Sequence, residues 1–251
     1  MLRYTINPKY SEISEFIISL PNLILSDGEM IHNGRNMIKT ITAPNGIKLN
    51  VKRYHKPTWI NAFVYSSGIR KPKGARAYEY SNILLDNEIE TPESVAYIED
   101  RRLGILGYSY YISIQCPYSH RLYELGDAHP SDYEPLGKAL AAFAASMHDK
   151  GFLHRDFSPG NILWEKDRQG HYNFSVVDIN RMYFGKVSAL MGSRNFSRLW
   201  GPKRFIQLMV EEYANLRGAN ASQCLEAVMD ERRKFWKRYM RKRTIEFKLE
   251  L

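Results

Sequence analysis

One ten-residue segment holds the clearest chemical pattern in the chain, His154-Arg155-Asp156-Phe157-Ser158-Pro159-Gly160-Asn161-Ile162-Leu163. A carboxylate such as that of Asp156 can accept the proton of an attacking hydroxyl group while it orients that group. The amide oxygen of Asn161, five residues later, can bind Mg²⁺ without adding negative charge beside a triphosphate. His-Arg-Asp alone means little, but here a predicted helix precedes it and a predicted strand follows it. The pattern therefore predicts phosphoryl transfer, with Asp156 as general base and Asn161 as a metal ligand.

A second acidic residue ends a short apolar segment. Asp178 follows Phe174–Val177 and lies 17 residues after Asn161. This spacing fits a β-hairpin that brings both residues to one metal site, where Asp178 would link Mg²⁺ to the β- and γ-phosphates. The alternative is an aspartate that only caps the turn after a strand, which is common. Because the catalytic pattern precedes it, we interpret Asp178 as a metal ligand.

A lysine and a glutamate upstream could complete a nucleotide site. Lys52 lies at the end of a predicted strand, where its ammonium group would bind the α- and β-phosphates. Glu79, in a predicted helix, is the candidate partner that would hold Lys52 in place. Arg53 is the main rival for the role of Lys52. In the alternative interpretation, Lys52 and Glu79 are solvated residues of a strand and a helix.

A hairpin before this strand is a weaker candidate for covering the phosphates. Gly34 and Arg35 follow Asn33, and Asn-Gly pairs are typical of two-residue β-hairpin turns. A full Gly-x-Gly-x-x-Gly pattern is missing. A plain surface hairpin is therefore about as good an interpretation as a nucleotide lid.

The first half of the chain is predicted to be rich in strands. Two turn signals, Asn33-Gly34 and Pro44-Asn45-Gly46, divide Met30–Tyr54 into a three-stranded antiparallel meander. A short helix over residues 10–20 should precede it and end before Pro21. After a connection at 55–74, we expect a helix at Ala75–Leu85 and strands at Val95–Ile98 and Ile105–Ile114.

The second half is predicted to be mainly helical. Its clearest helix is Ser131–Lys150, in which Ser131 and Glu134 form a capping box and Gly151 marks the stop. Strands are expected at Ile162–Trp164 and Phe174–Val177, with helices after them. A strand-rich half followed by a helical half indicates an α+β protein with two lobes. The composition changes at Cys116-Pro117, so the expected lobes are residues 1–115 and 116–251, joined by a hinge.

The composition excludes several protein classes. Apolar residues make up 44 % and charged residues 25 %, which is ordinary for a globular protein. The two cysteines, Cys116 and Cys224, are too few for a disulfide scaffold and are not spaced as metal ligands. No apolar run reaches the ~18 residues of a membrane span, and Glu12 and Glu15 lie where a secretory signal would be basic. We therefore expect a cytoplasmic protein.

The net charge of +9 is concentrated near the end of the chain, because residues 231–243 hold eight Lys or Arg and one Glu. This segment should form a helix and favours an anionic partner. In one interpretation the helix packs on the second lobe and its charged face is solvated. In the other, residues 232–243, with Arg70, Lys71 and Lys73, contact the headgroups of an anionic membrane. No nucleic-acid partner is expected.

Together these motifs resemble the lipopolysaccharide kinases that phosphorylate Kdo or heptose of the inner core, within the protein-kinase-like superfamily. The resemblance covers roughly residues 28–185. Besides the catalytic pattern, it rests on these segments: Gly34-Arg35, Val51-Lys52-Arg53-Tyr54, Arg76-Ala77-Tyr78-Glu79-Tyr80, Thr91-Pro92-Glu93-Ser94-Val95-Ala96 and Asp178-Ile179-Asn180-Arg181. In that family a polar residue and an arginine follow the metal-binding aspartate, where protein kinases have Phe-Gly.

The resemblance implies a bilobal protein-kinase-like fold, with an antiparallel sheet in the N-terminal lobe and a mainly helical C-terminal lobe. ATP would lie between the lobes with Mg²⁺, its adenine against the hinge backbone at Gln115, Cys116 and Tyr118. Gly34, Arg35 and Lys52 would contact the phosphates.

The implied acceptor is a sugar hydroxyl of a lipid-linked Kdo or heptose, phosphorylated at the cytoplasmic face of the inner membrane. Ser158 stands where Ser/Thr kinases carry lysine, and no Ala-Pro-Glu follows Asp178, which favours a non-protein acceptor. Two alternatives remain open: an atypical protein kinase with a short activation segment, and a non-catalytic binding protein that kept the fold.

Overall fold

The computed structural model describes residues 1–126, 128–245 and 247–251. The chain forms two compact units. The first comprises Met1–Pro117 and Asp178–Asn180, and the second comprises Tyr118–Val177 and Arg181–Leu251. The chain thus leaves the first unit two residues beyond the expected boundary after residue 115, and the short piece that carries Asp178 groups with the first unit.

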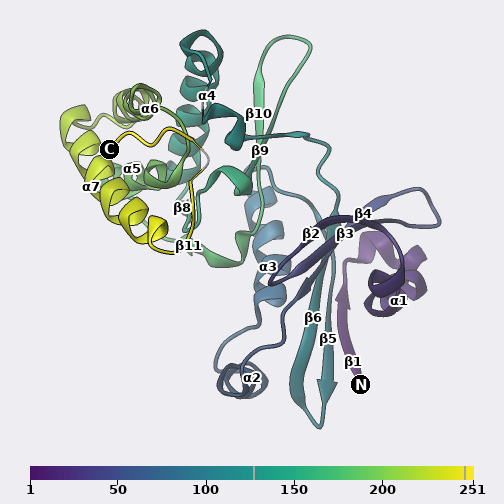
Figure 1. The fold of residues 1–251 in the computed structure, drawn as a ribbon. Helices are drawn as coiled ribbons and strands as arrows, with labels where there is room; N and C mark the ends of the chain where they lie inside the picture. The colour runs from purple at the N-terminus through teal and green to yellow at the C-terminus, as the bar shows by residue number, and fades with distance from the viewer. Residues whose placement is uncertain (127, 246) are drawn as a thin grey trace. The chain divides into compact units, whose positions relative to one another are not determined.

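A six-stranded antiparallel sheet forms the centre of the first unit (Figure 1). From edge to edge, the strand order is β1-β5-β6-β4-β3-β2. The strands are β1 (Leu2–Ile6), β2 (Glu29–Asn33), β3 (Met37–Thr42), β4 (Lys48–Tyr54), β5 (Ser94–Arg102) and β6 (Ile105–Ile114). The helices are η1 (Pro8–Ile13), α1 (Ser14–Ser26), α2 (Trp59–Ser66) and α3 (Lys73–Asp86).

The expected meander is confirmed, because β2, β3 and β4 pair in sequence as antiparallel neighbours. The β2–β3 connection is longer than expected: Asn33 pairs with Met37, which leaves a three-residue loop at 34–36. The edge strand β1, which pairs with β5, was not predicted. Its sequence Leu2–Ile6 does alternate apolar and polar residues, a strand signal that the sequence analysis overlooked in this short, mostly exposed segment.

The first helix does not end before Pro21, as the sequence suggested, but continues as α1 to Ser26. A proline inside a helix removes one backbone hydrogen bond. Here Leu20, Pro21 and Ile24 are all buried, and their burial offsets the lost bond.

The alternation of side chains along β4 separates the core of this unit from its polar site. Leu49 and Val51 join the apolar cluster formed with α1 on one face of the sheet. Lys52 and Tyr54 point to the opposite face, where α3 packs against β5 and β6 (Figure 1). The sheet therefore presents Lys52 on the α3 side.

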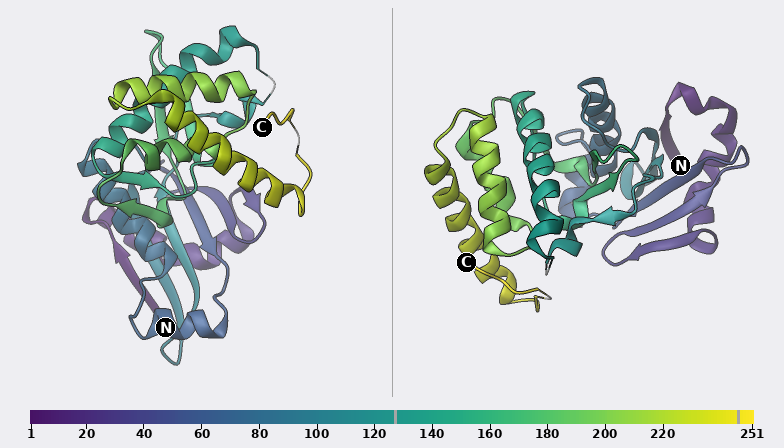
Figure 2. Two further views of the ribbon diagram at one scale, coloured as in Figure 1. Left: turned by 90° about the vertical axis from the view of Figure 1, so that its left-hand side faces the viewer. Right: turned by 90° about the horizontal axis from the view of Figure 1, so that it is seen from above.

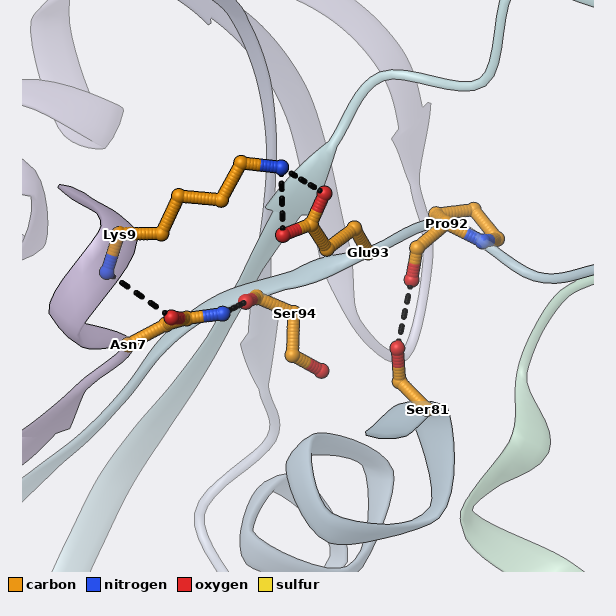
Figure 3. Close-up of polar contacts among 6 residues, drawn as sticks. All are labelled: Asn7, Lys9, Ser81, Pro92, Glu93 and Ser94. Atoms are coloured by element: carbon orange, nitrogen blue, oxygen red, sulfur yellow. Dashed lines mark hydrogen bonds and ion pairs between the residues drawn. The ribbon is translucent and has the colours of Figure 1, made fainter. Parts of the chain in front are cut away.

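The segment before β5 is fixed on both sides, as Figure 3 shows. Ser81 of α3 donates a hydrogen bond to the carbonyl oxygen of Pro92 (2.8 Å). On the other side, Lys9 forms an ion pair with Glu93 (2.8 Å), and the Asn7 amide donates to the carbonyl oxygen of Ser94 (3.0 Å). These contacts hold α3 in register with the sheet.

Helices, a three-stranded sheet of order β10-β9-β7 and a two-stranded β11–β8 sheet build the second unit. Its strands are β7 (His120–Arg121), β8 (Phe152–His154), β9 (Ile162–Lys166), β10 (Tyr172–Val176) and β11 (Met182–Phe184). Its helices are η2 (Leu122–Leu125), α4 (Pro130–Asp149), η3 (Pro159–Asn161), η4 (Ile179–Arg181, shared with the first unit), α5 (Ala189–Ser193), η5 (Arg194–Arg198), α6 (Lys203–Leu216) and α7 (Ala221–Met240).

The helices α4, α6 and α7 lie side by side, as the right-hand view of Figure 2 shows. A Cβ atom at Gly137 of α4 would lie 2.9 Å from Phe205 and Leu208 of α6, so glycine permits the close approach of these helices. The predicted capping box at Ser131 is wrong, because the N-cap is His129, whose side chain accepts from the Ser131 backbone, with Pro130 in the first turn. Within the described residues, no helix has the length and apolarity needed to cross a bilayer.

Candidate active site

Lys52 forms its ion pair with Asp178 inside the first unit. The Lys52 ammonium donates to Asp178 Oδ1 at 2.6 Å, and the Asn180 amide donates to the same oxygen at 2.6 Å. The side chain of Lys52 is only 10 % exposed. Residues separated by more than a hundred positions in the sequence are thus brought into one polar group.

The backbone of Asp178 is also unusual, because its φ angle is +57°. Few residues other than glycine adopt this left-handed conformation, and aspartate and asparagine tolerate it best. Such outliers concentrate at functional sites, where the surrounding contacts hold them. Asp178 is therefore fixed by its backbone as well as by its two donors.

The predicted pairing of Lys52 with Glu79 is not formed in this structure. Glu79 accepts both of its hydrogen bonds from Lys71, at 2.7 and 2.8 Å, and this pair is exposed. Lys52 is satisfied by Asp178, which lies in the same compact unit. The sequence could not reveal this choice, since both carboxylates are plausible partners for the lysine.

A cluster of positive charge surrounds this pair. The pKa of Lys73 is lowered by partial burial and by the charges of Arg35, Arg76 and Lys52, while Asp178 opposes the shift. Burial and the charge of Arg70 likewise lower the pKa of Arg76. The buried Nε of Arg76 and Oδ1 of Asn180 have no hydrogen-bond partner among the described residues. Crowded cations and the available N–H donor of Arg76 suit an anion, whereas Asn180 Oδ1 is an acceptor that suits a cation or an N–H or O–H donor.

Lys73 and Arg76 were missed as site residues by the sequence analysis. Their signal was the absence of any acidic residue from 55 to 78 beside several basic ones. Arg35 reaches this cluster electrostatically from the β2–β3 loop, as its effect on Lys73 shows. Gly34 lies in the same loop, and a Cβ at this position would lie 2.6 Å from Nε2 of the exposed His32 side chain, which would have to move.

In the second unit, His154 fixes the loop that carries Asp156. Its Nδ1 accepts a hydrogen bond from the backbone N–H of Asp156 (3.1 Å), and its Nε2 donates to the carbonyl oxygen of Val177 (2.9 Å). The ring is buried and pairs across β8 and β11 with Met182. One neutral imidazole thus fixes both the loop that carries Asp156 and the residue directly before Asp178.

Asn161 completes the loop. Its amide nitrogen donates to the carbonyl oxygen of Asp156 (2.9 Å), and its own carbonyl oxygen accepts from the Val177 N–H (3.0 Å). The predicted β9–β10 hairpin is confirmed, with Ile162 paired to Val176. With the amide nitrogen engaged, Oδ1 is the group that Asn161 can offer to a metal ion.

The carboxylate of Asp156 forms an ion pair with Arg198, which the sequence analysis did not identify. Arg198 Nη1 lies 2.7 Å from Asp156 Oδ1, and both side chains are about one-third exposed, at 34 % and 33 %. The guanidinium also lies over the ring of Phe235 in α7, 5.0 Å from its centroid. The candidate base therefore has a cation beside it at the solvent surface.

Helix α7 holds the segment around Arg198. Arg232 is fully buried and donates to the carbonyl oxygens of Leu199 (2.6 Å) and Gly201 (3.2 Å). Trp236 Nε1 donates to the carbonyl oxygen of Ser197 (3.1 Å). Burial lowers the pKa of the Arg232 guanidinium to about 10.

Arg232 is therefore a structural residue, and its assignment to a membrane-facing group is corrected. The remaining basic residues of the cluster are exposed: Arg233, Lys234, Lys237, Arg238, Arg241, Lys242 and Arg243. The helix thus has a packed inner face and a charged, exposed outer face, as the first interpretation expected, while contact of the outer face with a membrane stays a prediction.

The expected adenine-binding residues lie at the end of the first unit and the start of the second. The Gln115 backbone N–H donates to Lys48 O (2.9 Å), and its side chain donates to the carbonyl oxygen of Cys116 (3.2 Å). Cys116 is half-buried and forms no disulfide bond. Tyr118 begins the second unit.

The donor chemistry fits a magnesium–nucleotide pair. Mg²⁺ usually binds through one or two carboxylates or amide oxygens, and phosphates and waters supply the other ligands. Asp178 and Asn161 are such donors. Among the described residues, no group of three or more His, Cys, Asp or Glu side chains is placed to hold a metal by itself.

The architecture defines the class: the chain has a protein-kinase-like fold, with an antiparallel-sheet N-terminal unit and a mainly helical C-terminal unit. Residues 131–219 match the model of the lipopolysaccharide kinase (Kdo/WaaP) family. The match covers about a third of the chain and includes Asp156, Asn161 and Asp178. It confirms the resemblance inferred from the motifs, and with the fold it confirms the enzyme class, a phosphotransferase.

Solved structures agree on the fold. WaaP in complex with acyl carrier protein has a TM-score of 0.62 at 16 % identity, covering 94 % of this chain and 99 % of that chain. Amicoumacin kinase hAmiN, in complex with AMP-PNP, Ca²⁺ and Ami, has a TM-score of 0.58 at 10 % identity, covering 92 % and 88 %. The Rio2 kinase-ADP/Mg²⁺-phosphoaspartate complex from Chaetomium thermophilum scores 0.52 at 12 % identity, covering 96 % and 82 %. No curated protein sequence matches the chain.

Proposed function

We propose that this chain transfers the γ-phosphate of ATP, with Mg²⁺, to a sugar hydroxyl of the lipopolysaccharide inner core, on Kdo or heptose linked to lipid A. The observation that carries the proposal is the pair of hydrogen bonds made by His154. They fix the backbone of Asp156 and that of Val177, next to Asp178. A loop whose candidate base is fixed by backbone hydrogen bonds suits phosphoryl transfer, in which positioning and electrostatics supply most of the catalysis.

Each residue has a definite task in this proposal. Asp156 accepts the proton of the acceptor hydroxyl, and Asn161 with Asp178 would hold the metal. Bound Mg²⁺ would neutralise charge on the β- and γ-phosphates. Lys52, Lys73 and Arg35 bind phosphate oxygens. Glu79 acts indirectly, through Lys71 at the start of α3, and Gly34 lets the β2–β3 loop approach the phosphates.

The adenine would bind at the connection between the units, against the backbone of Gln115, Cys116 and Tyr118. The Gln115 N–H donates to Lys48 O and the Gln115 side chain donates to the Cys116 carbonyl oxygen, so backbone groups of Cys116 and Tyr118 are the proposed recognition points there.

Arg198 favours an anionic acceptor. A guanidinium that is paired with the base, and one-third exposed, can instead pair with a carboxylate or phosphate that enters with the acceptor. Kdo carries a carboxylate, whereas an unmodified heptose does not. This contrast makes Kdo the better of the two proposed sugars.

A lipid-linked acceptor requires work at a membrane surface. We place the protein on the cytoplasmic face of the inner membrane as a peripheral enzyme, with the exposed basic residues of α7 near anionic headgroups. Changing Lys237, Arg238, Arg241 and Lys242 to glutamate should slow transfer to acceptor in vesicles more than transfer to a water-soluble sugar. An acyl carrier protein is a second candidate partner, because the WaaP neighbour was solved with one.

The test is an acceptor panel. Purified protein is incubated with labelled ATP, Mg²⁺ and lipid A precursors that carry Kdo, Kdo and heptose, or no core sugar, and mass spectrometry locates the phosphate. We expect phosphate on a core sugar and a higher acceptor KM for Arg198→Ala, with a smaller change in kcat. Label found only on protein would favour the atypical protein kinase, and no ATP turnover with any acceptor would favour a binding protein.

A further inference from the structure

Large apolar side chains are exposed on helix α2 of the first unit. Trp59, Ile60 and Phe63 are 81 %, 57 % and 67 % exposed, and Ile69, just after the helix, is 74 % exposed. The three helical positions lie on one face, because residues three and four apart are neighbours on a helix. Such a face normally packs on a core, and a contiguous exposed apolar surface marks an interaction site.

The turn between β5 and β6 exposes a leucine for which packing gives no reason. Leu103 and Gly104 form the two-residue turn, with φ angles of +49° and +79°. Turns of this kind favour Asn-Gly, since both residues must be left-handed, and a leucine there is strained. Leu103 is nevertheless fully exposed, and the neighbouring Ile105 is 55 % exposed. The residue is unfavourable for the turn and makes no core contact, which points to a role outside folding.

The helix and the turn belong to one surface. The backbone N–H of Leu106 donates to Ser66 Oγ at the end of α2 (2.9 Å), and α2 lies beside the β5–β6 turn (Figure 1). We name this the hairpin-end surface. Its apolar members are Trp59, Ile60, Phe63, Ile69, Leu103 and Ile105.

Positive charge surrounds these apolar residues. Arg3 and Arg102 line a hollow of about 490 Å³ beside Leu103, and Arg70 follows Ile69 in the sequence. Nearby acidic residues neutralise little of this positive charge. Glu99 is buried and paired with Arg101, and Asp100 on β5 is half-buried.

We propose that the hairpin-end surface docks on an anionic phospholipid bilayer. The tryptophan, phenylalanine, isoleucine and leucine side chains enter the interfacial region, and the arginines bind headgroup phosphates. Side chains that protrude singly from a turn and a two-turn helix suit a deformable lipid interface better than a preformed protein groove. The surface differs from the outer face of α7, which offers charge with little apolar area.

The test measures binding of the full chain to vesicles, without ATP or acceptor, so that it does not depend on the proposed phosphotransfer. Vesicles of phosphatidylglycerol and phosphatidylcholine are compared with vesicles of phosphatidylcholine alone. Leu103→Asn is the sharpest variant, because asparagine suits the left-handed turn and should preserve or raise the melting temperature. The double variant Trp59→Ser/Phe63→Ser removes the aromatic anchors. Leu25→Asn, at a 59 % exposed leucine of α1, is the matched control.

We expect Leu103→Asn and the double variant each to bind anionic vesicles about 10-fold more weakly or worse, since each variant lacks at least one large apolar side chain that the bilayer would bury. Leu25→Asn should bind like the unmodified protein, and the fluorescence of Trp59 should shift to the blue on binding. Equal binding by all variants would overturn the proposal. The proposal would also be overturned if binding of an acidic acyl carrier protein required these residues and binding to vesicles did not.

Discussion

At the scale of single residues, Asp178 is the most constrained side chain of the candidate site. Its backbone is left-handed, and Lys52 and Asn180 both donate to Oδ1. The charge of Asp178 also acts on Lys73, whose pKa it tends to raise. A carboxylate held in this way is pre-organised for a cation, because little motion remains to be lost when the ligand binds.

Asp178→Asn should therefore impair metal-dependent nucleotide binding while the fold survives, since asparagine tolerates the same φ angle. We expect the affinity for Mg-ATP to fall at least ~10-fold, about 1.4 kcal/mol, because a charged metal ligand becomes neutral. Titration calorimetry measures this loss. Asp86→Asn, at the exposed end of α3, is the control and should bind normally. An unchanged Mg-ATP affinity for Asp178→Asn would remove this residue from the metal site.

At the scale of elements, α7 packs against the segment that carries Arg198, the partner of Asp156 in the candidate site. On its buried face, Arg232 and Trp236 donate hydrogen bonds to the carbonyl oxygens of residues 197–201. Its Phe235 lies under the guanidinium of Arg198. The helix therefore determines where the cation beside Asp156 is held.

Arg232→Met should lower the free energy of unfolding by about 3 kcal/mol, because several buried carbonyl oxygens lose a charged donor. Arg233→Met, one residue further and exposed, should change it by less than about 0.5 kcal/mol. Denaturant unfolding compares the two variants. Equal effects would mean that the carbonyl contacts contribute nothing special to stability.

The sequence predicted those elements whose signals are local. The meander, the β9–β10 hairpin and the loop with Asp156 and Asn161 follow from turn residues and spacing. Helix α2 was taken for a connection because its apolar residues face outward, so that no amphipathic pattern oriented towards a core was visible. The end of α1 was misplaced because Pro21 is offset by tertiary burial, which a local rule does not see.

The candidate site residues carry signals in the sequence, but the side-chain contacts that they make in the structure do not. Asp156, Asn161, Lys52 and Asp178 carry motif signals, whereas Arg198 lies 42 residues from its partner in no recognisable motif. The choice of Asp178 over Glu79 for Lys52 is likewise a three-dimensional fact. Pairings across such separations depend on packing that spacing alone does not encode.

At the scale of the whole molecule, one buried histidine links stability to pH. His148 of α4 is buried, and its Nδ1 lies 2.8 Å from Tyr213 Oη of α6. Burial, with a smaller contribution from the charge of Arg217, lowers the pKa of His148 to about 3. In the unfolded chain the imidazole titrates near its ordinary value of 6.5. Between these two values only the unfolded state binds the proton, so stability falls as the pH falls.

His148→Gln should therefore flatten the dependence of stability on pH between about 6 and 4. One such group contributes about 1.4 kcal/mol per pH unit in that range. The free energy of unfolding of both proteins is measured at several pH values, with pH 8 as the reference. Parallel curves would show that His148 is not held neutral in the folded protein.

The central claim is that Asp156 acts as the base in phosphoryl transfer, and a single-turnover experiment tests it most directly. The initial rate of phosphate transfer from ATP to a Kdo-bearing acceptor is compared for the unmodified protein and Asp156→Asn, with Mg-ATP affinity measured for both. General-base catalysis contributes about 10²–10⁴-fold. We predict that Asp156→Asn binds Mg-ATP normally and transfers phosphate at least ~10²-fold more slowly. A transfer rate close to that of the unmodified protein would contradict the account.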